Sequence, residues 1–224
     1  MGFCDRTELL IGKSNLDKLK DAKVIVFGVG GVGGYVAEML ARAGLGSLTI
    51  VDYDVVDVTN INRQIVALHS TIGKLKTDAF KARILDINPD INITAINAKV
   101  NKDNLQDFNL GSYDYIVDAI DTVTDKIDLI KECHKLDVKS ISAMGAGNRY
   151  SVPEFKCCDI FHTHNDGLAK ILRKRLKEEG VTSHQVVFTS QDRVSNGRVV
   201  GSISYYPAMC GCVIASVVVN DIIK

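Results

Sequence analysis

The chain has 224 residues, of which 46% are hydrophobic and 24% are charged, and its formal net charge is zero. This composition is that of a globular protein and excludes a global electrostatic attraction to nucleic acid or to a membrane. The N-terminus lacks the apolar core of a signal peptide, and the most apolar tail, residues 210–223, is too short to cross a bilayer and carries polar interruptions. We therefore expect a cytoplasmic protein without a membrane partner.

Helices and strands alternate through the first two thirds of the chain. Apolar residues at helical spacing, broken at Gly12, predict one or two short helices within residues 5–20. The strands that follow are expected at 23–27, 47–51, 91–98, 113–117 and 140–143, and the helices between them at 33–44, 74–88, 102–108 and 124–136. This rhythm predicts an α/β fold with a doubly wound, mostly parallel sheet and helices on both faces.

The pattern changes after Gly147. We expect an edge strand at 155–159, a basic helix at 168–179, a strand at 185–190, a mobile polar loop at 191–198 and an apolar helix at 213–223. We therefore expect residues 1–224 to form a single domain. Its nucleotide-binding core would be residues 5–150, and residues 151–224 would be a mixed C-terminal extension on the substrate side.

The first strand runs into a cluster of glycines, Gly28, Gly30, Gly31 and Gly33. Such a turn is tight, and it presents the free N–H groups of the next helix to an anion. The pattern therefore predicts a site for nucleotide phosphates. A dinucleotide site or a tight strand–helix junction has the same pattern.

Asp52 and Asp54 follow the second strand, at the edge where ligands bind in parallel sheets. An acid there accepts hydrogen bonds from ribose hydroxyls, in NAD as well as in ATP, or it caps a turn. Arg63 and Lys76 favour ATP, because cleavage between the α- and β-phosphates builds negative charge on the leaving pyrophosphate. Either cation taken alone also fits an ordinary solvated face.

Two further pairs of polar residues could complete such a site. Asn60 and Gln64 would add neutral donors. Asp118 lies at the end of the fourth strand and Asp121 just beyond it, and a carboxylate beside a triphosphate usually holds magnesium. Either acid could instead be the N-cap of the next helix.

The six cysteines lack the Cys-x-x-Cys pairing of a zinc site. We expect reduced, buried thiols. Two alternatives stay open: a metal cluster of Cys157, Cys158, Cys210 and Cys212, and a reactive thiol at Cys210 or Cys212.

Five motifs in this order resemble the Rossmann-like adenylating domain of the ubiquitin-activating-enzyme superfamily, which includes the molybdopterin-synthase and thiamine sulfur-carrier adenylyltransferases. They are Gly28-Val-Gly-Gly-Val-Gly33, Asp52-Tyr-Asp54, Thr59-Asn-Ile-Asn-Arg-Gln64, Gly73-Lys-Leu-Lys76 and Asp118-Ala-Ile-Asp121.

The resemblance implies a role for each matching residue. The glycines would line the phosphate turn, Asp52 would bind ribose with Asp54 beside it, and Asp121 would coordinate Mg²⁺. The residues that contact the triphosphate would be Asn60, Arg63, Gln64 and Lys76. Arg6 would reach from one subunit into the ATP site of its partner, which implies a homodimer with shared sites. The catalytic group would then be Arg6, Arg63, Lys76 and Asp121.

Several longer segments are similar to the tRNA threonylcarbamoyladenosine dehydratases. They are residues 6–12, 57–64, 67–73, 166–170 and 201–204. That family uses ATP to activate the threonyl carboxylate of threonylcarbamoyladenosine at tRNA position 37. The activated carboxylate closes on the carbamoyl nitrogen to form a hydantoin, and AMP and pyrophosphate leave.

Two other functions remain open on the sequence alone. One is an adenylyltransferase that activates the C-terminal glycine of a ubiquitin-like sulfur carrier. The missing Cys-x-x-Cys pairs depart from those enzymes, which commonly hold zinc. The other is a nucleotide sensor or an NAD-binding protein.

The resemblance also bears on partners and ions. Lysines and arginines within residues 170–177 would attract the tRNA backbone, although a solvated helix face has the same pattern. A monovalent cation and a sulfur-transfer protein partner are left open.

Overall fold

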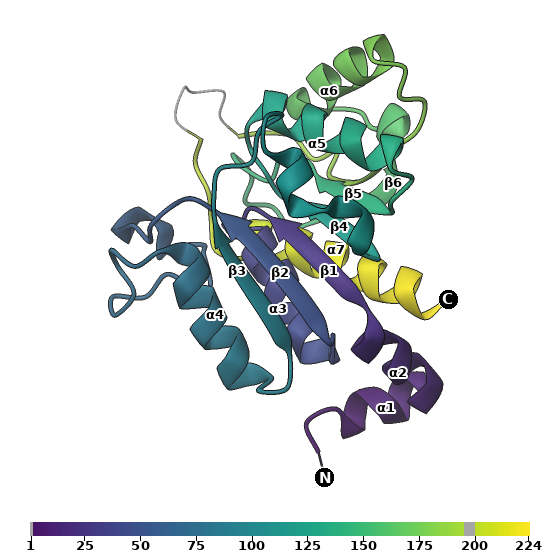
Figure 1. The fold of residues 1–224 in the computed structure, drawn as a ribbon. Helices are drawn as coiled ribbons and strands as arrows, with labels where there is room; N and C mark the ends of the chain where they lie inside the picture. Colours follow the sequence, from purple (N-terminus) through teal and green to yellow (C-terminus); the bar gives the residue numbers. More distant parts are fainter. Residues whose placement is uncertain (1, 195–199) are drawn as a thin grey trace.

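The computed structural model describes residues 2–194 and 200–224. Seven strands form one sheet in the order β3-β2-β1-β4-β5-β7-β6 (Figure 1). Every neighbouring pair is parallel except β6 and β7, which are antiparallel. The strands are β1 (Lys23–Phe27), β2 (Ser47–Asp52), β3 (Asn92–Asn97), β4 (Tyr115–Asp118), β5 (Ser140–Ala143), β6 (Lys156–Asp159) and β7 (Gln185–Phe188).

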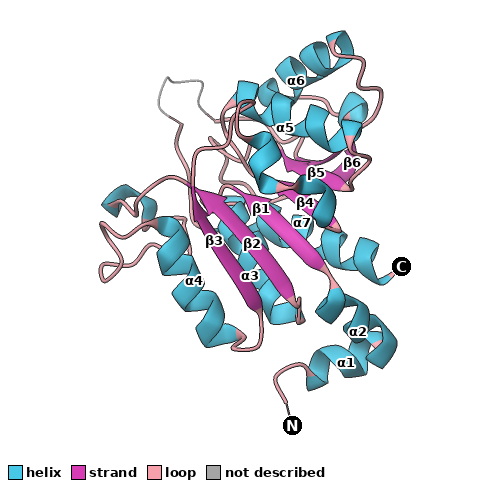
Figure 2. Cartoon of the chain, in the orientation of Figure 1, coloured by secondary structure: helices cyan, strands magenta, loops and turns pink. Residues whose placement is uncertain are grey.

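Helices follow most of the strands, as expected for a doubly wound sheet (Figure 2). The α-helices are α1 (Asp5–Ile11), α2 (Lys13–Asp21), α3 (Gly33–Ala43), α4 (Lys76–Ile87), α5 (Val123–Lys135), α6 (Gly167–Glu178) and α7 (Tyr205–Ile223). Short 3₁₀ turns are η1 (Val58–Asn60), η2 (Leu105–Phe108), η3 (Leu110–Ser112) and η4 (Ile160–His162).

Alternate side chains of the central strands bury against different helices. Val24 and Val26 of β1 belong to the core formed with α3, α4 and α7. Ile25 and Phe27 face the other way and pack with α5 and η2, while α6 packs with α5 and β7. Figure 1 shows α3 and α7 behind the strands. The apolar runs predicted a sheet covered on both faces, and the structure confirms it.

The predicted elements are confirmed with three corrections. The strand expected at 113–117 is β4, which begins at Tyr115 and ends at Asp118. The helix expected at 102–108 is only the short 3₁₀ turn η2. The last helix begins at Tyr205 rather than at Val213.

The early start of α7 depends on its packing against α3. Pro207 lies in the first turn of α7, where a missing N–H costs nothing. A Cβ at Gly211 would lie 2.5 Å from the Val32 carbonyl oxygen, so only glycine allows the two helices to approach this closely. Pro207 and Gly211 disfavour a helix when only the sequence is considered, but the packing of α7 against α3 accommodates both residues within the helix.

The length of α7 also corrects the expectation that the C-terminal tail is too short to cross a bilayer. With 19 residues, α7 is long and apolar enough to do so by length and composition. Tyr206, Cys210, Ile214 and Val218 are buried at helical spacing against the rest of the structure. Core helices pass the same test, so α7 is only weak evidence for a membrane span.

The division at residue 150 stays a prediction. Strands from both sides of it share one sheet, because β7 pairs with β5 and β6 pairs with β7. Residues 195–198 of the predicted mobile loop lie outside the described residues.

Candidate functional site

A cavity of about 790 Å³ opens where β1, β2, β4 and β5 end. The parallel arrangement brings residues from distant parts of the chain to this edge. Ten of the residues singled out from the sequence line the cavity: Gly28, Gly30, Gly31, Asp52, Asp54, Asn60, Arg63, Gln64, Lys76 and Asp121. Gly33 and Arg6 do not line it.

The glycine turn requires glycine at its two ends for different reasons. Gly28 has a positive φ of 82°, and a Cβ there would lie 2.8 Å from the Ala119 carbonyl oxygen. A Cβ at Gly33 would lie 1.9 Å from the Gly28 carbonyl oxygen. Gly33 therefore allows α3 to start directly against the turn, although it is too deep to face the cavity.

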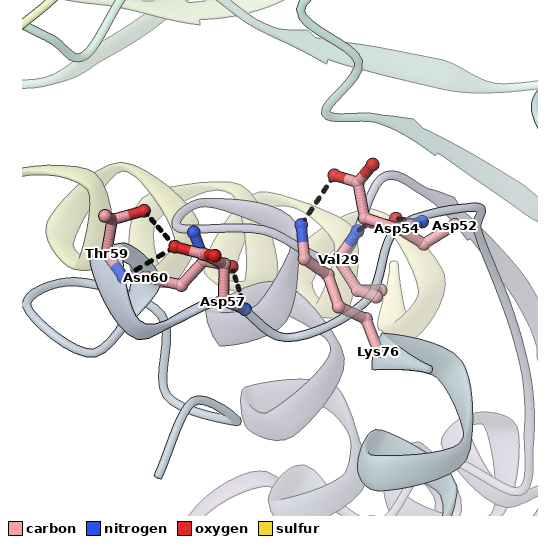
Figure 3. A network of polar contacts seen from close by, with 7 residues as sticks. All are labelled: Val29, Asp52, Asp54, Asp57, Thr59, Asn60 and Lys76. Carbon is pink, nitrogen blue, oxygen red and sulfur yellow. Dashed lines mark hydrogen bonds and ion pairs between the residues drawn. The ribbon is translucent and has the colours of Figure 1, made fainter. Parts of the chain in front are cut away.

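Asp52 ties the glycine turn to the end of β2. Its Oδ2 accepts a hydrogen bond from the Val29 N–H at 2.8 Å, and its Oδ1 accepts one from the Asp54 N–H at 2.9 Å. Figure 3 shows these residues together with Lys76. A carboxylate has further lone pairs, so Asp52 can hold the turn and still accept from a ligand hydroxyl.

The two predicted cations have different surroundings. Lys76, at the start of α4, is only 4% exposed, and its Nζ lies 2.8 Å from Asp54 Oδ2. The Arg63 guanidinium donates from Nη1 to the Thr59 carbonyl oxygen and to Asn62 Oδ1, each at 2.9 Å. Within residues 2–194 and 200–224, no carboxylate lies within 4.0 Å of Arg63.

The short turn η1 fixes Asn60 at the cavity wall. Asp57 accepts hydrogen bonds from the Thr59 hydroxyl and N–H, which lower the pKa of the Asp57 carboxyl. Asn60 Oδ1 accepts in turn from the Asp57 N–H at 3.1 Å, which completes a capping box (Figure 3). This leaves the Asn60 side-chain amide as a neutral donor at the cavity wall.

Gln64 carries a buried polar atom without a partner. Its Oε1 is inaccessible to solvent and has no hydrogen-bond partner in the described part of the chain. Such an orphan is rare in folded proteins and suggests a missing donor. Because Gln64 lines the cavity, a bound molecule could supply that donor.

Asp118 and Asp121 differ sharply, although they are close in sequence. Asp121 is exposed, lines the cavity and has no cationic side chain within 4.0 Å among the described residues. Asp118 is 2% exposed and lies 2.8 Å from the ammonium of Lys126. The N-cap of α5 is Thr122, so the alternative that either acid caps this helix is wrong.

Asp118 belongs to a buried network that the sequence did not reveal. Ser142 Oγ donates to Asp118 Oδ2 at 2.6 Å and lies 2.8 Å from His184 Nε2. Since the hydroxyl proton goes to the carboxylate, His184 Nε2 must be the donor of the second bond. Burial, with a smaller contribution from His134 and Lys126, lowers the pKa of His184 to about 3. The network fixes the end of β4 next to the loop that carries Asp121.

The cavity is also lined by residues that the sequence analysis did not assign to the site. Lys99 lies 5.9 Å from the ring centroid of Tyr53 and 3.9 Å from Asp125, at the β3 side of the cavity. The loop 143–147 lines the β5 side, together with Arg193. Two glycines, Gly145 and Gly147, lie just after β5. Glycines after a strand are typical of ligand-binding turns, so the sequence did contain a pattern that indicates this loop. Arg193 lay in a segment predicted only as a mobile loop.

Arg6 lies on α1, outside the cavity. The helix has no buried residue, and Leu9 and Leu10 are 87% and 84% exposed. Arg6 is itself exposed. Its action on the site of a partner subunit stays a prediction.

The prediction of buried thiols is confirmed only for Cys133 and Cys210, because Cys157 is exposed and Cys4, Cys158 and Cys212 are partly exposed. All six are free, and complete burial raises the pKa of Cys210 to about 12. Burial also raises the pKa of the partly exposed Cys212. Residues 2–194 and 200–224 contain no cluster of His, Cys, Asp or Glu suited to a metal ion, so the predicted alternative of a four-cysteine cluster is wrong.

Comparisons with known proteins agree with this geometry. The model of the ThiF family matches residues 4–224. A tRNA threonylcarbamoyladenosine dehydratase of Bacillus subtilis is 40% identical, and the match covers 98% of this chain and 94% of that protein. A molybdopterin-synthase adenylyltransferase of Haemophilus influenzae is 31% identical over 71% of this chain and 65% of its own length.

The fold also matches solved structures. The crystal structure of E. coli tRNA N6-threonylcarbamoyladenosine dehydratase in complex with ATP has a TM-score of 0.92 and 34% identity, covering 98% of this chain and 93% of that one. The same enzyme in complex with AMP matches with a TM-score of 0.91. The chain therefore belongs to the ThiF family and, within it, to the tRNA threonylcarbamoyladenosine dehydratases.

Proposed function

We propose that this chain uses ATP to cyclise the threonylcarbamoyl group of N6-threonylcarbamoyladenosine at position 37 of tRNA. The observation that carries the proposal is the single cavity in which a glycine turn, a ribose-side acid and two cations meet. The E. coli relative binds ATP, the substrate expected of adenylation, and AMP, the product expected after ring closure.

The first step would be adenylation. A carboxylate oxygen attacks the α-phosphorus of ATP, the bond to the bridging oxygen breaks, and pyrophosphate leaves. The glycine turn would hold the phosphates, and Arg63 and Lys76 would offset the charge that grows on the pyrophosphate. Lys76 would exchange part of its contact with Asp54 for the nucleotide.

Asn60 and Gln64 would add neutral contacts on the same wall. Both are buried and line the cavity. A nucleotide hydroxyl or a protonated group of the acceptor would satisfy the unpartnered Gln64 Oε1. Asp52 would accept from the ribose hydroxyls.

Mg²⁺ would bind at Asp121. The carboxylate faces the cavity and has no cationic side chain within 4.0 Å among the described residues, which suits an ion that prefers oxygen ligands and keeps several waters. Bound there with ATP, the ion would neutralise phosphate charge. The monovalent cation stays a prediction.

The second step would be ring closure. The carbamoyl nitrogen attacks the acyl carbon, loses its proton, and AMP leaves with the carboxylate oxygen. The reaction is intramolecular, so proximity supplies much of the rate and no protein nucleophile is required. The fully buried, weakly acidic Cys210 accords with this.

A homodimer would complete the site. The exposed Leu9 and Leu10 give α1 an apolar surface that a second subunit would bury. Arg6, on the same helix, would then reach the partner's nucleotide. An Arg6→Ala subunit mixed with an Arg63→Ala subunit would regain activity through hybrid dimers if sites are shared.

The remaining predictions concern partners and placement. α6 carries exposed basic residues that would attract the tRNA backbone. A sulfur-transfer protein partner and a cytoplasmic location are also proposed on the resemblance, as is a single adenylating domain over residues 1–224.

The decisive experiment compares acceptors. The protein is incubated with ATP, Mg²⁺ and either tRNA carrying threonylcarbamoyladenosine or candidate ubiquitin-like sulfur carriers, while pyrophosphate release is followed. We expect release with the modified tRNA and loss of one water from the mass of the nucleoside. An unchanged nucleoside mass, with release dependent on a carrier, would favour the alternative adenylyltransferase.

A further inference from the structure

The segment before residue 195 is held firmly, although it has no regular structure. The Arg149 guanidinium, 2% exposed, donates from Nε to the Gln191 carbonyl oxygen at 2.8 Å. Asn165 Nδ2 donates to Asp192 Oδ1 at 2.8 Å. These two contacts hold Gln191 and Asp192, the residues just before Arg193, and so fix the position from which Arg193 reaches the cavity.

The Arg193 guanidinium lies beside two glycines, Gly145 and Gly167, which have no side chains. A Cβ at Gly145 would lie 3.3 Å from Arg193 Nη2, and a Cβ at Gly167 would lie 3.9 Å from both terminal nitrogens. The two glycines thus make room for the guanidinium. Gly145 also lines the cavity, so the guanidinium faces the same space as the proposed nucleotide site.

Arg193 forms no ion pair among the described residues. No carboxylate lies within 4.0 Å of it in the described chain, and the remaining residues, 1 and 195–199, include no Asp or Glu. Asp166 is near, but its two oxygens accept hydrogen bonds from the N–H groups of Ala169 and Gly145. By contrast, the cavity lysines, Lys76 and Lys99, have Asp54 and Asp125 as partners.

The position of Arg193 separates it from the phosphate turn. It lies beside the loop after β5, whereas Arg63 lies beside Gly31 in the turn after β1. Strand β4 lies between β1 and β5, so the two loops are about 10 Å apart across the sheet. One arginine is therefore placed for the nucleotide, and the other for a second anion.

We propose that Arg193 binds an oxyanion of the RNA acceptor; this inference rests on the proposed function. The acceptor carboxylate must approach the negatively charged phosphates of ATP, and an unpaired guanidinium nearby reduces that repulsion. Its planar fork also fits carboxylate or phosphate oxygens by two parallel hydrogen bonds. The oxyanion is either the threonyl carboxylate or a backbone phosphate beside the modified nucleoside.

The test uses two substitutions and a matched control. Arg193→Gln removes the charge, Arg193→Lys keeps it without the fork, and Lys81→Gln removes an exposed positive charge on α4 that does not line the cavity. The probes are anticodon stem–loop RNAs with adenosine 37 either threonylcarbamoylated or unmodified. We measure kcat/KM, the KM for ATP, and RNA affinity at several salt concentrations.

Arg193→Gln should lower kcat/KM for the modified RNA by about 10- to 100-fold, the range for losing hydrogen bonds to a charged group. Arg193→Lys should recover part of this loss, while the KM for ATP stays within twofold. Unchanged affinity for unmodified RNA identifies the carboxylate. If the substitution weakens binding of both RNAs equally, the oxyanion is a phosphate. The slope of the logarithm of the binding constant against the logarithm of the salt concentration should then be smaller in magnitude by about one.

Two negative results are distinguishable. If the unsubstituted chain converts the modified RNA and Arg193→Gln does so equally well with unchanged RNA affinity, the role of Arg193 is refuted. If the unsubstituted chain does not convert the RNA at all, the proposed function fails, and an RNA oxyanion fails with it. An effect of Lys81→Gln equal to that of Arg193→Gln would show a general charge effect and would also refute the inference.

Discussion

Lys126→Met tests the buried network beneath the candidate site. The Lys126 side chain is fully buried, and its ammonium lies 2.8 Å from Asp118 Oδ2 and 3.4 Å from the Asp118 carbonyl oxygen. Methionine has similar bulk without the charge. The variant would leave the Asp118 carboxylate buried, and the donors to it that remain in the described part of the chain are the Ser142 hydroxyl and the Ile120 N–H.

Removing one partner of a buried ion pair costs about 3–5 kcal/mol, because the other charge is left without compensation. In a protein of this size, 1 kcal/mol corresponds to about 2–4 °C in Tm. We therefore expect the Tm of Lys126→Met to fall by roughly 6–20 °C. Urea unfolding followed by circular dichroism would give the free energy directly.

A second substitution separates the charge effect from lost packing. In Lys126→Met with Asp118→Asn, neither member of the pair is charged, so the double variant should be more stable than the single one. Lys135→Met is the control, since Lys135 lies on the same helix but pairs with Glu132 at the surface. It should change the free energy of unfolding by less than about 1 kcal/mol.

The reasoning would be refuted by either of two results. One is a Lys126→Met protein whose free energy of unfolding lies within about 1 kcal/mol of the parent, outside the range given above. The other is a double variant that is no more stable than Lys126→Met. The second result would mean that shape at Lys126, rather than the unpaired carboxylate, determines the loss.

Three further predictions concern the cavity, pH and the thiols. Arg63→Ala should lower pyrophosphate release by about 30- to 1,000-fold with little change in Tm, because its two hydrogen bonds are near the surface; release above one third of the parent rate would contradict its role. The folded-state pKa of His184 is lowered to about 3, so the unfolded chain takes up a proton below its ordinary value of 6.5 while the folded chain does not. The free energy of unfolding should therefore fall as the pH drops from 6.5 toward 3, with this residue contributing a slope of up to about 1.4 kcal/mol per pH unit. Urea unfolding should show that the free energy of unfolding falls less between pH 7.5 and pH 5.5 for His184→Gln than for the parent. An equal fall in both proteins would show that His184 is not the residue responsible. Maleimide labelling read by mass spectrometry should modify the exposed Cys157 well before the buried Cys210, and early labelling of Cys210 in folded protein would contradict the structure.

Local signals in the sequence were enough to predict the elements that build the cavity. The glycine turn, the acids after β2 and the apolar strands each depend on neighbours within a few residues, so chain order reveals them. The N-terminal half of α7 shows the opposite case. Pro207 and Gly211 disfavour a helix locally, and only the close contact with α3 stabilises one there.

Which charges meet depended on the tertiary structure. Lys76 pairs with Asp54 across the connection between β2 and α4, and Lys126 pairs with Asp118 across the connection between β4 and α5. Nothing in the spacing of these residues specifies those partners. The exposure of Arg193 beside two glycines likewise results from the placement of α6 against the loop after β5.

The sequence by itself determined the fold class, the order of the elements and the chemistry of the phosphate side. Periodicity and turn residues act over short distances, so they survive in a one-dimensional pattern. Only the tertiary structure decided which acid is buried with a lysine, which glycines face the cavity, and that neither Arg63 nor Arg193 has a carboxylate partner within the described residues. Those properties depend on burial and long-range contact, which arise when the sheet is assembled.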